Sequence, residues 1–256
     1  MKAFLSTSLA IATILLSSTA FAASKPTVVL VHGAFAESSS WEGVASKLIK
    51  EGYPVVAVAN PLRGLQFDSE YVATIVKSIQ GPIVLVGHSY GGSVITDVPV
   101  KGTNVKALVF VAGLAPENGE SAASLGKQFP TGTLGEALAP PLVQPDGKHD
   151  LYIVPEKFWK QFAADVPEAK AALMSATQRP VTAEALNDPS GDPSWKELPS
   201  HFIYGTADKN IPADLHAFMA KRAKAKETVV VRDASHVVMI THPDLVSEMI
   251  ERAAGQ

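Results

Sequence analysis

The sequence predicts an α/β fold in which a mostly parallel sheet of about six strands is flanked by helices. Short apolar runs rich in β-branched residues alternate with segments of helical hydrophobic spacing along most of the chain. Such alternation is typical of a parallel sheet covered by helices on both faces. The chain has 256 residues, of which 46% are hydrophobic and 18% are charged, so it can bury the core that one such domain needs.

The first part of the chain alternates regularly between predicted strands and helices. The runs at 27–31, 54–59, 82–86 and 105–111 are rich in valine, isoleucine, leucine and alanine, as buried strands are. The segments 40–51 and 69–79 carry apolar residues at helical spacing, and a third helix is expected from Gly91 onward.

The alternation breaks between about Gly113 and Pro199, a stretch rich in proline and glycine that is too long for a simple loop. Helical patches occur within it at 156–165 and 168–177. We therefore expect residues 114–198 to form a helical cap, inserted before the last two strands and lying over the carboxyl edge of the sheet. The alternation then resumes, with strands predicted at 201–204 and 228–231 and helices at 213–222 and 243–253.

The N-terminus has the pattern of a signal peptide over residues 1–22, which leaves 24–256 as the folded domain. Lys2 precedes an apolar stretch that is short for a membrane-spanning helix, and Ala20-Phe21-Ala22 forms a small-x-small cleavage site. We expect export to the periplasm or the medium, with no stable membrane association after cleavage. An uncleaved N-terminal anchor is the alternative.

Composition excludes several kinds of chemistry. The chain has no cysteine, so disulfides, thiolate catalysis and zinc–thiolate sites are ruled out. A net charge of −3 gives no reason to expect a nucleic-acid partner. No His-x-x-x-His or Glu-x-x-His run is present, so neither a metal nor another cofactor is predicted.

The segment Gly87-His88-Ser89-Tyr90-Gly91 has the form Gly-x-Ser-x-Gly and lies between a predicted strand and a predicted helix. A strand that turns at once into a helix exposes the residue at the turn, and the flanking glycines leave room for the bend. Ser89 Oγ should then lie at the carboxyl end of the sheet, above a helix N-terminus that can stabilise an oxyanion. Ser89 is therefore the candidate nucleophile.

A serine nucleophile needs a base, and the base needs a carboxylate that fixes its tautomer. Asp208 and His236 each follow a late predicted strand, so both should reach the edge of the sheet where Ser89 lies. The order Ser, Asp, His along the chain is that of a nucleophile elbow with its two partners. Asp233 is an alternative acid, although its position favours a role in turning the loop.

The other histidines are expected to be structural. His32 begins the loop after the first strand, and His88 should pack beneath the serine turn. His149, His201 and His216 have no catalytic companions at a suitable spacing.

A tetrahedral intermediate needs hydrogen-bond donors directed at its oxygen. The backbone N–H of Tyr90, next after the serine, is one expected donor. The second should come from the loop after the first strand, at Ala34 or, as an alternative, at Phe35. Gly33 would let that loop approach the serine closely.

Several apolar side chains could line a substrate pocket. Those expected to do so are Phe35, Phe129, Phe158, Trp159 and Val237. As a group they favour an uncharged, hydrophobic acyl or alcohol moiety.

The 32–35 opening, the serine motif, the 205–212 acid loop and His236 together resemble the α/β-hydrolase superfamily over nearly the whole mature chain. The compact form is similar to the group that contains plant methylesterases and hydroxynitrile lyases. The resemblance implies Ser89 as nucleophile, His236 as base and Asp208 as orienting acid, with a small-molecule ester as substrate and no cofactor.

Two departures separate the sequence from the lyases of this group, which usually carry threonine in place of Gly33 and lysine in place of Val237. The lysine helps the lyases to hold the cyanide leaving group, so its absence favours ester hydrolysis. We therefore expect an exported serine esterase that acts on small to medium hydrophobic substrates through an acyl-enzyme. Alternatives are a cofactor-free perhydrolase or a carbon–carbon lyase on the same scaffold, or a small-molecule receptor with a slow triad.

Overall fold

The computed structural model describes residues 25–255, and the expected signal peptide at 1–22 lies outside them. A six-stranded parallel sheet forms the centre, with the order β2-β1-β3-β4-β8-β9. The strands are β1 (Thr27–Val31), β2 (Val55–Val58), β3 (Ile83–His88), β4 (Val105–Val111), β8 (Ser200–Gly205) and β9 (Glu227–Val231). The predicted fold class is confirmed.

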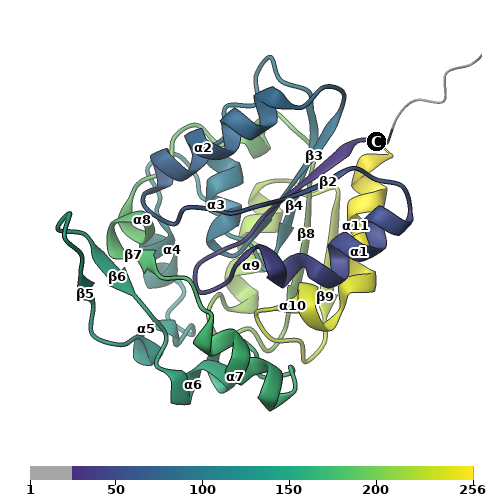
Figure 1. Cartoon of the computed structure of the whole chain (residues 1–256). Coiled ribbons are helices and arrows are strands. Elements are labelled where there is room, and N and C mark those ends of the chain that lie inside the picture. Colours follow the sequence, from purple (N-terminus) through teal and green to yellow (C-terminus); the bar gives the residue numbers. More distant parts are fainter. Residues whose placement is uncertain (1–24, 256) are drawn as a thin grey trace, which may run out of the picture.

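Helices cover both faces of this sheet, as Figure 1 shows. On one face, α1 (Glu42–Lys50) packs against α11 (Pro243–Ala254), and on the other α2 (Leu65–Ser78) packs against α3 (Tyr90–Asp97). A further helix, α9 (Ala213–Arg222), packs against β8, and the short α10 (Val238–Thr241) precedes α11. Within residues 25–255, no helix combines the length and the apolar character needed to cross a membrane.

The strand sequences explain the order of the sheet. Every residue of the central strand β3 is buried, and its neighbours β1 and β4 are almost as fully enclosed. Continuous apolar runs of this kind belong in the middle of a parallel sheet. The edge strand β9 alternates between more and less exposed residues, because only one of its faces meets the core. Because these strands are all parallel, the carboxyl ends of β3, β8 and β9 lie at the same edge of the sheet.

The long insertion between β4 and β8 forms the cap. Its elements are α4 (Ala122–Gln128), α5 (Leu134–Ala137), β5 (Leu142–Val143), β6 (His149–Leu151), α6 (Pro155–Phe162), α7 (Glu168–Ala176), β7 (Val181–Thr182), α8 (Ala183–Asn187) and a 3₁₀ turn at Ser194–Lys196. The expected helices at 156–165 and 168–177 correspond to α6 and α7. The expectation of helices alone was incomplete, because β5, β6 and β7 form a small antiparallel sheet. Strands of two or three residues are too short to show a hydrophobic period.

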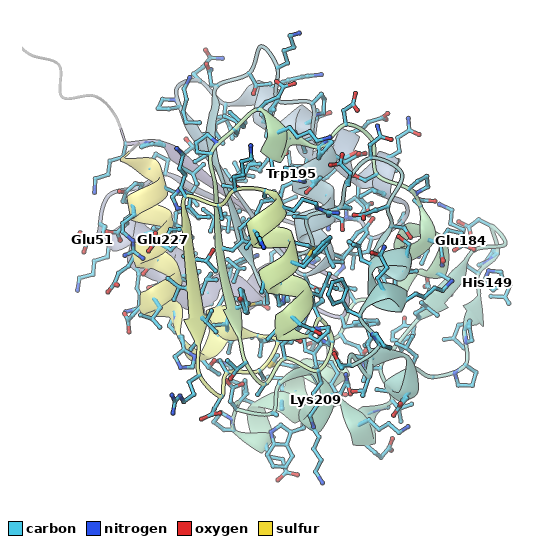
Figure 2. All side chains as sticks on the ribbon, turned by 180° about the vertical axis from the view of Figure 1, so that it is seen from behind. Glu51, His149, Glu184, Trp195, Lys209 and Glu227 are labelled. Atoms are coloured by element: carbon cyan, nitrogen blue, oxygen red, sulfur yellow. The ribbon has the colours of Figure 1, made fainter. Side chains whose placement is uncertain are left out.

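Specific polar contacts attach the cap to the loop between β2 and α2. The guanidinium of Arg63 donates to Asp150 Oδ1 on β6 at 2.5 Å and to Pro180 O at 3.0 Å. The backbone N–H of Leu65 donates to Asp188 Oδ2 at 3.0 Å. On the outer edge of the cap, Figure 2 shows His149 beside Glu184, whose side chains hydrogen-bond at 2.9 Å.

Candidate active site

Ser89 occupies the tight turn between β3 and α3. Its backbone has φ 53° and ψ −125°, in a region that non-glycine residues rarely adopt. The conformation is held from both sides: Ser89 N–H donates to Ala112 O at 3.1 Å, and Ser89 O accepts from the N–H of Leu114 at 3.1 Å. A Cβ on Gly91 would lie 2.4 Å from Val31 O, so the motif needs glycine there for the close approach of β1.

Asp208 and His236 form a hydrogen-bonded pair at the carboxyl ends of β8 and β9. His236 Nδ1 lies 2.7 Å from Asp208 Oδ2, and both side chains are fully buried. The other oxygen of Asp208 accepts from the backbone N–H groups of Asn210 at 2.8 Å and Ile211 at 3.0 Å. Because an ionised carboxylate can only accept, Nδ1 of His236 carries the proton that faces it. In the neutral imidazole, Nε2 is then the basic nitrogen.

The basic nitrogen of His236 has no hydrogen-bond partner among residues 25–255, so Ser89 is not hydrogen-bonded to it in this structure. The two residues are nevertheless neighbours through His88. His88 Nε2 donates to His236 O at 3.1 Å, and the two ring centroids are 4.8 Å apart. The residue before the serine thus fixes the backbone of the histidine. Burial keeps the pKa of His88 well below its usual value, so it acts as a neutral structural donor.

His216 is a second histidine at this site. Its Nε2 lies 3.3 Å from Asp208 Oδ2, and its ring stacks on Tyr204 with centroids 4.7 Å apart. Burial by itself would raise the pKa of the Asp208 carboxyl, but His236 and His216 outweigh it and hold that pKa well below its usual range. Sequence analysis predicts no catalytic partner for His216, although its place in the first turn of the helix after the acid loop is a usable signal.

Two backbone N–H groups beside Ser89 have no acceptor among residues 25–255. They belong to Ala34 and Tyr90, the two expected oxyanion donors. The alternative donor, the N–H of Phe35, is already bonded to Arg179 O of the cap at 3.0 Å. A Cβ on Gly33 would lie 2.6 Å from Ser89 Cβ, so the loop approaches the serine as closely as it does because residue 33 has no side chain.

The side chain of Tyr90 has a separate partner. Its hydroxyl donates to Asp68 Oδ2 at 2.8 Å, deep in the core beside α2. Burial and the adjacent Asp68 carboxylate raise the pKa of Tyr90 far above its usual value, so the phenol stays protonated. Burial also raises the pKa of Asp68. The pair fixes the ring of Tyr90 in the core.

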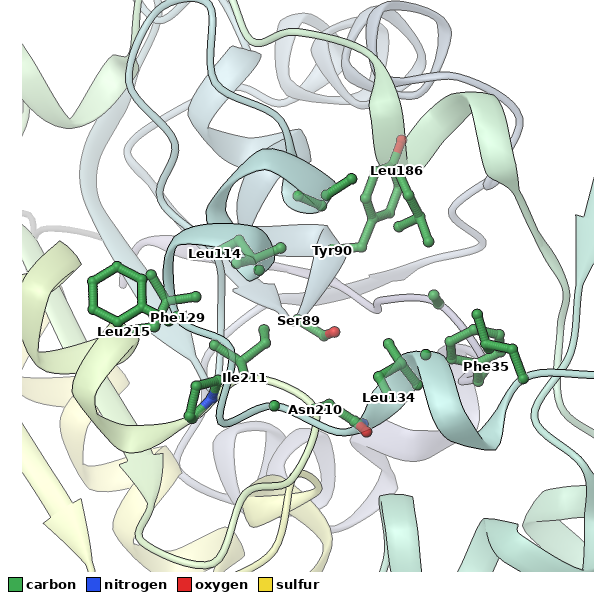
Figure 3. Close-up of a pocket in the computed structure, with 18 of the residues that line it drawn as sticks. Phe35, Ser89, Tyr90, Leu114, Phe129, Leu134, Leu186, Asn210, Ile211 and Leu215 are labelled. Carbon is green, nitrogen blue, oxygen red and sulfur yellow. The ribbon is translucent and has the colours of Figure 1, made fainter.

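Ser89 opens into a cavity of about 350 Å³ between the sheet edge and the cap (Figure 3). Its wall is mostly apolar. Side chains that line it include Phe35, Leu114, Phe129, Leu134, Leu138, Phe162, Leu186, Ile211 and Leu215. Phe35 and Phe129 are therefore placed where the sequence suggested.

The other three residues expected in the pocket do not line this cavity. Phe158 is fully buried in the cap, with its ring centroid 5.0 Å from that of Phe162. Trp159 donates from Nε1 to Val166 O at 2.9 Å. Val237, the residue after His236, is fully buried and lines a separate pocket together with Phe35 and Phe162. The apolar face of α6 packs inside the cap, and only Phe162 at its end reaches the cavity.

The cap also holds both loops that carry the Asp208–His236 pair. Gln161 of α6 donates from Nε2 to Lys209 O at 3.1 Å, and Figure 2 shows Lys209 beside the cap helices. The Asp165 carboxylate accepts from the N–H of Ser235 at 3.2 Å and from the Thr241 hydroxyl at 2.9 Å. Sequence reasoning missed these contacts because they join segments far apart along the chain. Across the described part of the chain, no group of three or more metal-binding side chains is gathered in one place.

The parallel sheet, the serine at its turn and the Asp–His pair at two later strand ends define the architecture of an α/β hydrolase. The chain belongs to the alpha/beta hydrolase family, whose family model matches residues 28–249. It is 28% identical to the alpha/beta hydrolase nvfD of Aspergillus novofumigatus, over 91% of this chain and 98% of that one. It is 23% identical to Methylesterase 3 of Arabidopsis thaliana, over 91% and 97% of the two chains.

Solved structures give the same picture of the fold. Polyneuridine aldehyde esterase superimposes with a TM-score of 0.75 at 17% identity, covering 89% of this chain and 98% of that one. An extracellular α/β-hydrolase from a Paenibacillus species gives a TM-score of 0.72 at 22% identity, with the same coverage. The predicted resemblance to the compact methylesterase-like group is confirmed.

Proposed function

We propose that the protein is a serine hydrolase that cleaves carboxylic esters of small to medium hydrophobic substrates through an acyl-enzyme on Ser89. The observation that carries this proposal is the buried Asp208–His236 pair, whose Nε2 has no partner among residues 25–255, at the same edge of the sheet as an elbow serine that opens into an apolar cavity. Membership of a hydrolase family with esterase relatives supports it.

The proposed reaction starts when substrate enters the cavity and Ser89 forms its hydrogen bond to His236 Nε2. Catalytic hydrogen bonds are often completed only in the substrate complex. Ser89 Oγ attacks the ester carbonyl while His236 takes the hydroxyl proton, and Asp208 stabilises the charged imidazolium. The N–H groups of Ala34 and Tyr90 hold the oxyanion. His236 returns the proton to the departing alcohol, and a water molecule, activated by His236, then releases the acid.

The cavity wall supports a hydrophobic substrate. Lys127, which is exposed, is the one ionisable residue among those that line the cavity apart from Tyr90, whose hydroxyl bonds to Asp68. An apolar wall of this kind favours uncharged acyl and alcohol groups. The lyase alternative gains no support, because Gly33 has no side chain to offer and Val237 is fully buried.

Substitution of the serine tests the proposal. Ser89→Ala should abolish hydrolysis of a short p-nitrophenyl ester while the circular dichroism spectrum and thermal midpoint stay close to those of the wild type. A fluorophosphonate probe should add one label, on Ser89. Ser39→Ala, at an exposed hydroxyl, is the matched control and should keep full activity. An active Ser89→Ala protein, or a wild type that resists the probe while a control esterase is labelled, would refute the mechanism.

We also propose that the protein is exported after cleavage of the 1–22 segment, on the strength of the N-terminal pattern. Expression of the full chain in a bacterial host should give a mature protein that starts at Ala23 or Ser24. Intact-mass measurement of the periplasmic and medium fractions tests this. An uncleaved chain in the membrane fraction would contradict it.

A further inference from the structure

Asn210 carries an amide group whose donor side has no partner among the residues that the structure describes. Its Nδ2 atom is buried and has no hydrogen-bond acceptor among residues 25–255. Asn210 also lines the cavity beside Ser89, and Figure 3 shows it on the same wall as Ile211 and close to Leu134. A buried donor without an acceptor is unfavourable, so this residue of the cavity lining favours an acceptor that residues 25–255 do not supply.

The orientation of this amide follows from its neighbour Gln161. Lys209 O can only accept, so the Gln161 atom that lies 3.1 Å from it must be the donor Nε2. The same Nε2 lies 2.8 Å from the Asn210 side chain, which must therefore present its oxygen Oδ1. Gln161 Oε1 in turn accepts from the Thr133 hydroxyl at 3.0 Å. The two hydrogens of Asn210 Nδ2 are thus directed away from Gln161 and remain unused.

The rest of the cavity offers little competition for a polar group. The Tyr90 hydroxyl is bonded to Asp68, and the side chain of Lys127 is exposed. Ser89 and the two oxyanion donors are engaged by the scissile ester itself in the proposed reaction. The amide of Asn210 is therefore a fixed donor in an otherwise apolar wall.

We propose that Asn210 determines substrate specificity by donating a hydrogen bond from Nδ2 to an uncharged acceptor oxygen of the substrate, outside the scissile ester. The preferred substrates are then hydrophobic esters that carry a ketone or ether oxygen, rather than pure hydrocarbon esters. This inference rests on the proposed function and narrows its substrate class. One placed polar group in an apolar pocket is a common source of specificity, because analogues that lack the matching group leave it unpaired.

The test compares matched esters that differ by one carbonyl. The kcat/KM values are measured for methyl pentanoate against methyl 4-oxopentanoate, and for methyl hexanoate against methyl 5-oxohexanoate. The preference for the oxo ester is then compared between the wild type and Asn210→Leu, so that differences in intrinsic reactivity cancel. We expect the preference to fall about tenfold in the variant for at least one pair, the loss of about one neutral hydrogen bond.

Two further variants make the result interpretable. Asn210→Asp keeps the size and the acceptor that faces Gln161 but removes the donor, so it should lose the preference as Asn210→Leu does. Both changes retain the backbone N–H that bonds to Asp208. Asn104→Leu, an exposed asparagine just before β4 at the opposite edge of the sheet, is the matched control and should keep the wild-type preference.

A binding measurement separates failure of this inference from failure of the proposed function. Inactive Ser89→Ala protein should bind methyl 4-oxopentanoate or methyl 5-oxohexanoate more tightly than its hydrocarbon counterpart, and Asn210→Leu in that background should remove the difference. If the esters are hydrolysed but neither Asn210 variant changes the preference, the inference is wrong and the esterase function stands. If no ester is hydrolysed, the proposed function fails, and equal binding of the paired esters would overturn the role of Asn210 as well.

Discussion

His216 and His236 share one acceptor, the Oδ2 atom of Asp208, at 3.3 and 2.7 Å. Both imidazoles are buried, and each directs a nitrogen at the same carboxylate oxygen. With the two backbone N–H groups on Oδ1, Asp208 accepts four hydrogen bonds although water cannot reach it. The second histidine therefore helps to keep the orienting carboxylate ionised.

His216→Leu should weaken this arrangement. Loss of one donor raises the pKa of Asp208 toward its ordinary value and leaves the carboxylate less well satisfied, at a cost of about 1–3 kcal/mol in the free energy of unfolding. A depressed carboxyl pKa contributes stability that is complete above the unfolded pKa of about 3.9 and is lost as the pH falls below it. Because the Asp208 pKa is less depressed in the variant, the variant should lose less stability than the wild type below that pH. Urea unfolding between pH 7 and pH 3 measures both effects. His201→Leu, at a buried histidine at the far end of β8, is the control and should leave kcat/KM unchanged.

Gly33→Ala should remove activity almost completely. The new Cβ would lie 2.6 Å from Ser89 Cβ and 2.7 Å from His88 O, so the oxyanion loop or the elbow must shift. Displacing one oxyanion donor commonly lowers kcat by about 10²–10³-fold. Assays of kcat with a p-nitrophenyl ester check this. Gly255→Ala has only ordinary van der Waals contacts and should behave as the wild type. Near-normal kcat in Gly33→Ala would show that the loop is not a close neighbour of the nucleophile during turnover.

Asp165→Ala should lower kcat more than it changes KM. Asp165 lies outside the cavity, but it holds the N–H of Ser235, the residue before His236. Release of that loop should reduce the fraction of molecules with the imidazole correctly placed, and misplacement of this kind has large effects on rate. The stability change should stay small because the carboxylate is exposed. Asp165→Asn keeps an acceptor and should recover much of the kcat. Equal losses in both variants would argue for a charge effect instead.

The stability of the protein should fall as the pH drops from about 6.5 to 4. Burial lowers the pKa of His32 to about 4, whereas the unfolded chain binds a proton near pH 6.5. A depressed histidine pKa contributes stability that is complete above pH 6.5 and is lost as the pH falls, at about 1.4 kcal/mol per pH unit for one such group. Buried His88 and His216 act in the same direction.

His32→Gln tests the share of that slope due to one histidine. His32 Nε2 accepts from the N–H of Asn60 at 3.1 Å, and Nδ1 donates to Gly33 O at 2.9 Å. Glutamine offers an acceptor and a donor but does not titrate. The variant should be less stable at pH 7 and show a shallower decline toward pH 4 in urea titrations. An unchanged slope would mean that other groups dominate the acid sensitivity.

The sequence predicted the limits of strands and helices best where those limits depend on residues close together along the chain. Strand β1 and helix α9 have the predicted limits of 27–31 and 213–222, because apolar runs and helical periods reflect burial directly. Helix α2 begins at Leu65, four residues before the predicted start at Ser69. Asp188 of the cap accepts a hydrogen bond from the N–H of Leu65 in the first turn, and the local sequence pattern does not predict this contact.

Some residues of the candidate site could likewise be predicted from the sequence, and others could not. Ser89, Asp208 and His236 could be predicted because each follows a strand, and parallel strands end at the same edge of a sheet. The pocket expectations at Phe158 and Trp159 failed because an aromatic residue in an amphipathic helix packs equally well into the cap or against a ligand. The roles of His216 and Asn210 depend on hydrogen bonds made with the folded acid loop and the cap, which form only once the chain has folded.

The hydrogen bond from Phe35 N–H to Arg179 O joins the loop that carries Ala34 to the segment between α7 and β7. The cap is thus a structural partner of the oxyanion loop as well as a wall of the cavity. A chimaera that received the cap of a relative would need a carbonyl at the same place to hold the loop. Transplanting the cap to change selectivity should therefore disturb turnover as well, unless that single backbone contact is rebuilt.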